Sequence, residues 1–99
     1  MKTTIRRPVI KPCPHKPETD AGELVITFAG PAPELHDLAA KVDALCIAPV
    51  THEDFTEAVA ALVPGATVTT AWNTGPWFIE VTAGEGDPVL REPVDAAGA

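Results

Sequence analysis

The feature that most limits the fold of this 99-residue chain is a helical pattern in its middle that is enclosed by chain-breaking residues. Apolar residues recur there at the spacing of one helix face, with charged residues off that face: Leu35, Leu38, Ala39, Val42 and Leu45. Pro33 suits the first turn of such a helix, and Pro49 ends it. His36 falls off the apolar stripe, which predicts a surface position.

A second helical pattern follows at once. Thr51 is a predicted N-cap, and Glu53 and Asp54 suit the positive end of a helix dipole. The residues expected to be buried on this helix are Phe55, Ala58, Val59 and Leu62. Pro64-Gly65 then ends it. Two adjacent helices with a short connection are expected to pack antiparallel.

Strand patterns lie on both sides of the helices. The stretch 3–11 contains Pro8, which predicts an irregular or edge strand. Asp20-Ala21-Gly22 predicts a turn into a strand over 23–29. Segments 66–72 and 77–83 read as strands joined by a hairpin-like turn. The order predicts one α+β domain over residues 1–83: a four-stranded antiparallel sheet in β-β-α-α-β-β order with both helices on one face.

Composition and charge indicate the character of the two chain ends and the classes of partner that the chain disfavours. Residues 84–99 are rich in Gly, Pro, Ala and acidic residues, which predicts a flexible acidic tail. Residues 1–11 form a basic N-terminal arm or edge strand, since five of the seven basic residues of the chain lie in the first sixteen positions, without any acidic residue. The net charge of −7 makes nucleic acid an unfavourable general partner.

The apolar runs are too short to span a bilayer, and no signal-peptide pattern is present at the start. Two cysteines do not make a disulfide framework. We therefore expect a cytoplasmic protein with no membrane partner.

Trp72 and Trp77 flank the last predicted turn and are expected to pack in the core or at an interface.

Four polar residues are candidates for chemistry: Cys13, Asp20, His52 and Glu53. Each also has an ordinary structural explanation. Cys13 fits a buried loop thiol, Asp20 a turn-forming residue before Gly22, and the other two a helix first turn.

Their joint spacing resembles the 7-cyano-7-deazaguanine reductases, the nitrile reductases of queuosine synthesis, which belong to the tunnelling-fold superfamily. Cys13-Pro14 matches that family's Cys-Pro pair, and Asp20 its aspartate seven residues later. Glu34 matches the glutamate that opens its first helical segment, and eighteen residues on His52-Glu53-Asp54 matches its His-Glu pair. The resemblance covers about residues 12–83 and includes the order of strands and helices.

The resemblance implies a role for each residue. Cys13 would attack the nitrile of a 7-deazapurine to form a thioimide, because a thiolate suits this electrophile. Asp20 would protonate the nitrogen, which requires a protonated carboxyl near neutral pH, through desolvation or a nearby negative charge. Glu53 would accept two hydrogen bonds from a guanine-like ring, and His52 would orient the base or shuttle a proton. The family also implies a homo-oligomer with active sites at subunit interfaces, where Glu34 contacts the substrate of a neighbouring subunit.

The chain departs from the family where NADPH binds. His36, Ala39 and Cys46 stand where the family has basic residues for the cofactor phosphates, and Leu35 replaces a serine. Basic residues near the N-terminus could bind the cofactor phosphates instead: Arg6, Arg7, Lys11 and Lys16. NADPH is therefore a doubtful cofactor, and nitrile chemistry is better supported than hydride transfer.

Three alternatives to a nitrile reductase-like enzyme remain. Some tunnelling-fold relatives keep the cysteine, lack the NADPH residues and form an amidine with ammonia on a base within tRNA. A catalytically inactive binding or structural oligomer is a second alternative. A zinc enzyme is the third, with ligands from Cys13, His15, Cys46 and His52, but this spacing matches no familiar zinc pattern, and no metal is expected.

Overall fold

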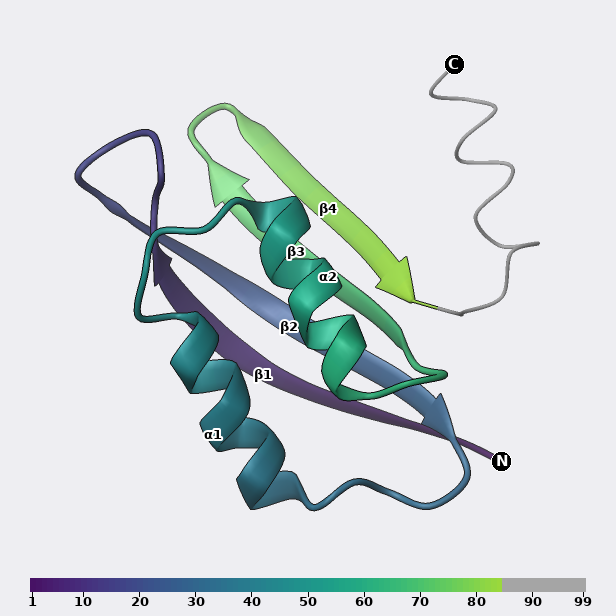
Figure 1. Cartoon of the computed structure of the whole chain (residues 1–99). Helices are drawn as coiled ribbons and strands as arrows, with labels where there is room; N and C mark the ends of the chain where they lie inside the picture. The colour runs from purple at the N-terminus through teal and green to yellow at the C-terminus, as the bar shows by residue number, and fades with distance from the viewer. Residues whose placement is uncertain (85–99) are drawn as a thin grey trace.

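The computed structural model describes residues 1–84 as four strands and two helices (Figure 1). The elements are β1 (Lys2–Pro12), β2 (Thr19–Ala29), α1 (Leu35–Leu45), α2 (His52–Leu62), β3 (Thr67–Thr74) and β4 (Trp77–Gly84). The predicted α+β class and the β-β-α-α-β-β order are confirmed. The predicted tail lies outside the described residues except for Gly84, which ends β4.

The strands form one antiparallel sheet in the order β1-β2-β3-β4, and both helices cover the same face of it (Figure 1). The helices run antiparallel, and α2 packs against β3 and β4. In the described sheet β1 is an edge strand, which accommodates Pro8 because an edge proline leaves no central ladder bond unmade. No helix in residues 1–84 is long and apolar enough to cross a membrane.

The core lies between the helix-facing side of the sheet and the two helices. Strand alternation places one residue in two on this side, and the helices add one stripe each. The buried members are Val9, Leu24, Ile26, Phe28, Val68 and Trp72 from the sheet, and Leu38, Val42, Phe55 and Val59 from the helices. Leu35, the first residue of the predicted α1 stripe, is 48% exposed. Thr56 is fully buried although it is polar, because its hydroxyl is hydrogen-bonded.

The predicted turn at Asp20-Ala21-Gly22 is wrong, because all three residues lie within β2. Gly22 is opposite Trp72 in the pairing of β2 with β3. A Cβ on Gly22 would lie 2.5 Å from a ring carbon of Trp72 and 2.5 Å from the carbonyl oxygen of Ala71. The glycine therefore serves the close packing of the tryptophan on the strand, not a turn.

Two further element ends differ from the prediction. The N-cap of α1 is Glu34, whose side chain accepts a hydrogen bond from the backbone of Asp37, so Pro33 precedes the helix. The last hairpin turn contains only Gly75 and Pro76, because β3 extends through Thr74. Gly75 has a φ of +67°, which suits the first central residue of a type II′ hairpin turn.

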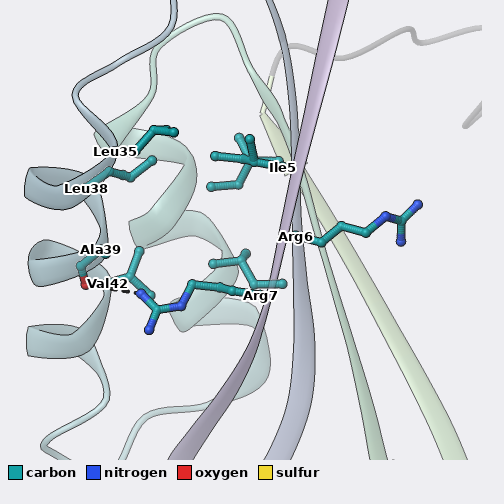
Figure 2. A pocket seen from close by; sticks show the side chains of 9 residues that line it. Ile5, Arg6, Arg7, Leu35, Leu38, Ala39 and Val42 are labelled. Carbon is teal, nitrogen blue, oxygen red and sulfur yellow. Dashed lines mark hydrogen bonds between the residues drawn. The ribbon is translucent and has the colours of Figure 1, made fainter.

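A cavity of about 310 Å³ lies between α1 and β1, and Arg7 reaches across its edge to the helix (Figure 2). The Arg7 guanidinium donates to the Ala39 carbonyl at 3.4 Å and pairs with Asp43 at 3.1 Å. Arg6 points away to the other face of the sheet, where it pairs with Glu23 at 3.2 Å (Figure 2). Both arginines of the predicted basic arm therefore have carboxylate partners within the domain.

Candidate functional site

Three chain segments meet at one end of the sheet: the β1–β2 loop, the N-terminus of α2 and the β3–β4 turn (Figure 1). A cavity of about 480 Å³ lies between them. Its lining includes Cys13, Asp20, His52 and Glu53, the four candidates from the sequence. A volume of this order suits a small-molecule ligand.

Cys13 opens the loop that joins β1 to β2. Its backbone N–H donates to the carbonyl of Glu18 at 2.9 Å, which closes the loop across 13–18. The prolines on either side of Cys13 restrict the backbone, so the cysteine is held at the end of β1 and not within the sheet ladder. The cysteine is half-buried, forms no disulfide and lines the cavity.

Asp20 lies in β2 directly opposite Lys11 of β1. The Lys11 Nζ is 3.0 Å from Oδ2 of Asp20, and the two side chains are 0% and 14% exposed. The nearest charge to Asp20 is therefore positive, whereas the expected proton-donor role called for desolvation or a negative neighbour. The lysine donates a hydrogen bond to this carboxyl oxygen.

Lys11 is the residue that the sequence reasoning missed. The sequence places Lys11 in a basic arm, but its side chain is fully buried and lines the cavity. Besides Asp20, its Nζ donates to the carbonyl of Val50 at 2.7 Å and lies 4.8 Å from the ring centroid of Trp72. Strand alternation offered a signal, since Lys11 is two residues from the buried Val9 and so shares its face of the sheet.

His52 stacks on Trp72, with ring centroids 4.6 Å apart and an interplanar angle of 12°. Trp72 is fixed in turn, because its Nε1 donates to the Thr70 hydroxyl at 2.8 Å and Thr70 is 2.6 Å from the Thr56 hydroxyl. Thr56 donates to the backbone carbonyl of His52 at 2.7 Å, which closes the network. Trp72 is thus a core residue, as predicted, and it also supports the histidine.

Trp77 is 71% exposed, and its place at an interface stays a prediction.

Burial lowers the pKa of His52 from its ordinary value, and the positive charge of Lys11 lowers this pKa further. Asp20 and Glu53 act in the opposite direction without reversing the shift. The Nδ1 atom is buried and has no hydrogen-bond partner among residues 1–84. The lowered pKa favours a neutral imidazole near neutral pH.

Glu53 is exposed in the first turn of α2 and lines the cavity. The predicted N-cap is confirmed, because the Thr51 hydroxyl accepts a hydrogen bond from the backbone N–H of Asp54 at 3.1 Å. Glu53 forms no ion pair with another residue of the described chain. Its carboxylate is therefore available to accept hydrogen bonds from a ligand.

Glu34 does not line this cavity. It lies at the N-cap of α1, at the opposite end of the sheet from the α2 N-terminus, with His36 Nδ1 3.4 Å from its carboxylate (Figure 1). Its contact with the substrate of a neighbouring subunit stays a prediction. His36 is fully exposed, as expected.

The second cysteine has a different environment. Cys46 caps the C-terminus of α1 and does not line the cavity. Burial raises the pKa of its thiol, and the nearby Asp43 raises this pKa further, against smaller opposing effects of Arg7 and Lys11. Cys46 is therefore a poorly ionised thiol. Within the described residues no group of three or more His, Cys, Asp or Glu side chains is arranged to hold a metal ion.

The comparisons with known proteins identify the fold. No protein-family model matches the chain, and no curated protein matches it. Among solved structures, an archaeosine synthase QueF-like crystal structure in the apo form matches with a TM-score of 0.78 and 18% sequence identity. The match covers 88% of this chain and 96% of that chain. At this identity the likeness shows the fold alone, and the chain has the tunnelling fold that the family resemblance implied.

Proposed function

We propose that this chain modifies the nitrile of 7-cyano-7-deazaguanine, or of a close 7-deazapurine, through a covalent thioimide on Cys13. The observation that carries the proposal is the shared cavity of Cys13, Asp20, His52 and Glu53, which come from segments far apart in the sequence. Its volume of about 480 Å³ accommodates a flat bicyclic base.

The residue types suit the reaction. Sulfur is the side-chain nucleophile of choice for a nitrile carbon, and the addition needs a proton on the nitrile nitrogen. Asp20 lies in the same cavity as Cys13 and can transfer that proton. His52 presents a neutral ring whose orientation is fixed by Trp72, which supports a role in orienting the base.

Glu53 would select the base. Its unpaired carboxylate at the rim of the cavity can accept two parallel hydrogen bonds from the N–H and amino groups of a guanine-like ring. A base that lacks these donors would leave the carboxylate unpaired, and such sites discriminate strongly. The proposed ligand is therefore a small molecule of the 7-deazaguanine type.

For the second half of the reaction we propose ammonia in place of NADPH. Ammonia adds to the thioimide carbon and the Cys13 thiol leaves, which yields an amidine without any change of oxidation state. The α1 surface supports this choice, because His36, Ala39 and Cys46 provide no fixed positive charge and the side chain of Lys41 already pairs with Asp37 at 3.0 Å. Lys11 is buried and cannot reach a phosphate outside the cavity. The fold likeness to an archaeosine synthase is in keeping with this proposal.

Intact mass spectrometry after incubation with 7-cyano-7-deazaguanine tests the first half. We expect wild type to gain the mass of one base, Cys13→Ala to gain none, and Cys46→Ser, the matched control thiol, to behave as wild type. No adduct on wild type at saturating base would overturn the enzyme proposal and favour the inactive binding or structural oligomer.

Two parallel incubations test the second half. One contains the base with ammonium and the other the base with NADPH, and the products are separated by liquid chromatography. We expect the amidine in the first and no oxidation of NADPH in the second. Oxidation of NADPH that depends on the base would replace amidine formation with nitrile reduction.

A further inference from the structure

We propose that Thr56 and Thr70 are positioning residues for this reaction, because their buried hydroxyls fix the ring of His52 at the cavity. The inference rests on the proposed function, in which His52 orients the base. Neither threonine lines the cavity, and neither does Trp72, which lies between them and the histidine ring. All three residues therefore act through His52 and make no contact with a ligand in the cavity.

The hydrogen bonds of the two threonines run in one direction only. The indole Nε1 of Trp72 donates to the Thr70 hydroxyl at 2.8 Å, and the Thr56 hydroxyl donates to the backbone carbonyl of His52 at 2.7 Å. The two hydroxyl oxygens are 2.6 Å apart, and a hydroxyl has a single proton to donate. Since Thr56 has already donated its proton, Thr70 is the donor between them. Each hydroxyl thus accepts one hydrogen bond and donates one.

This chain of hydrogen bonds joins both the backbone and the ring of His52 to the same tryptophan. Its last bond holds the His52 carbonyl in the first turn of α2, and the imidazole stacks on the indole with centroids 4.6 Å apart. The Nδ1 atom of His52 is buried without a hydrogen-bond partner among residues 1–84, so no hydrogen bond at that atom fixes the ring. The orientation of the imidazole therefore depends on where the indole of Trp72 lies.

The indole has little freedom to move. Trp72 is fully buried, the Phe55 ring meets it edge-on with centroids 5.7 Å apart, and Gly22 lies against its ring. Apolar packing fills the space around the ring, whereas the hydrogen bond from Nε1 to Thr70 also fixes its rotation. Thr70 therefore sets the surface on which the histidine stacks.

Stability alone does not require this chain of hydrogen bonds. Burying a hydroxyl costs free energy that its hydrogen bond only roughly recovers, and apolar groups of the same shape can be equally stable. A threonine that bonds back to the carbonyl four residues earlier, as Thr56 does, also slightly destabilises a helix. A fully satisfied polar network instead specifies one arrangement of the core. Here that arrangement includes a side chain of the cavity wall.

Hydrogen exchange of the two indole N–H groups, followed by NMR, tests the chain without any substrate. We expect Nε1–H of Trp72 to exchange at least about a hundredfold more slowly than that of Trp77, whose side chain is exposed. Most of this protection should disappear in Thr70→Val, which keeps the shape and removes the hydroxyl, and should remain in Thr70→Ser. An unprotected Trp72 indole in wild type would overturn the proposal.

The rate of Cys13 adduct formation over a series of base concentrations tests the positioning role. We expect Thr70→Val to lower the saturating rate about tenfold, with a smaller change in the half-saturating concentration, because the base binds but is held less well against the thiol. Thr70→Ser should retain most of the rate. Thr69→Val is the matched control, since it removes an exposed cross-strand hydroxyl pair on the other face of the same strand.

The same substitution in a His52→Ala background shows whether the effect passes through the histidine. No further loss of rate there supports the proposal, whereas an equal loss in both backgrounds overturns it. A wild-type saturating rate in Thr70→Val also overturns it. If Thr70→Val does not fold, Thr56→Val serves the same purpose, because it removes the acceptor of Thr70 and leaves the bond from Trp72 in place.

The two measurements separate this inference from the proposed function. An adduct on wild type with no effect of Thr70→Val overturns the inference alone. No adduct on wild type overturns the proposed function and the positioning role together, while exchange of the Trp72 indole still reports whether the chain of hydrogen bonds exists.

Discussion

Lys11 and Asp20 occupy opposite positions in the register of β1 and β2, and their Nζ and Oδ2 atoms lie 3.0 Å apart at the wall of the cavity that Cys13 lines. The pairing explains the seven-residue spacing between Cys13 and Asp20. Five residues close the loop after Cys13, Thr19 begins β2, and Asp20 is the first residue of β2 whose side chain faces the helices. The spacing therefore sets a carboxylate, together with its lysine, next to the loop that holds the thiol.

The two cysteines should react with thiol reagents at clearly different rates. We expect a small alkylating reagent near neutral pH to modify Cys13 first, because burial and Asp43 raise the pKa of Cys46 and keep it a thiol. Peptide mapping by mass spectrometry over time measures the two rates. Addition of the nitrile base should protect Cys13, and equal labelling of both cysteines would contradict the assignment.

Glu53→Gln should weaken binding of 7-cyano-7-deazaguanine by about ten- to a hundredfold, because an amide can no longer accept two parallel hydrogen bonds. Isothermal titration calorimetry with Cys13→Ala as the background measures binding without the covalent step. Asp54→Asn is the matched control, since Asp54 is the next residue in the same exposed turn and does not line the cavity. An equal loss in both variants would point to the helix terminus and not to base recognition.

Stability of the fold should fall as pH is lowered through the titration range of His52. The folded-state pKa of this histidine is depressed below its ordinary 6.5, so between the two values the unfolded chain binds more protons. The contribution of His52 is present above 6.5 and is lost as pH falls through the folded pKa. Thermal unfolding across this range should show a smaller slope for His52→Gln than for wild type. His36→Gln, at an exposed position, should retain the slope.

Gly22→Ala should destabilise the fold by about 1–3 kcal/mol, because the added methyl would overlap the Trp72 ring and the Ala71 carbonyl. Urea unfolding followed by tryptophan fluorescence measures the change. Ala21→Val is the control, because it adds volume at an exposed position on the other face of the same strand. A Gly22→Ala variant as stable as wild type would show that Trp72 can shift without cost.

Subunit complementation tests the predicted contribution of Glu34. If Glu34 reaches the substrate of a neighbour, Cys13→Ala and Glu34→Gln are each inactive alone but regain part of the activity when unfolded together and refolded. Some interfaces then contain an intact Cys13 from one subunit and an intact Glu34 from the other. No recovery in mixed oligomers would contradict a shared site.

The order of the elements and the helix N-cap at Thr51 could be predicted from the sequence. The functional roles of Cys13, Asp20, His52 and Glu53 stay predictions. The element order and the cap depend on local spacing: apolar periodicity defines the two helices, and a capping residue marks where α2 begins. The grouping of the four candidates followed from resemblance to a family, and the fold places them around one cavity.

Only the tertiary structure decided what surrounds those residues. From the sequence, Lys11 was predicted to belong to a charged arm, Gly22 to form a turn, and Trp72 to pack in the core or at an interface. The pairing of β1 with β2 buries Lys11 against Asp20, and the pairing of β2 with β3 presses Trp72 onto Gly22 and leaves its ring beneath His52. Strand register joins residues that are distant in the chain, so no local pattern encodes which charge will meet which carboxylate.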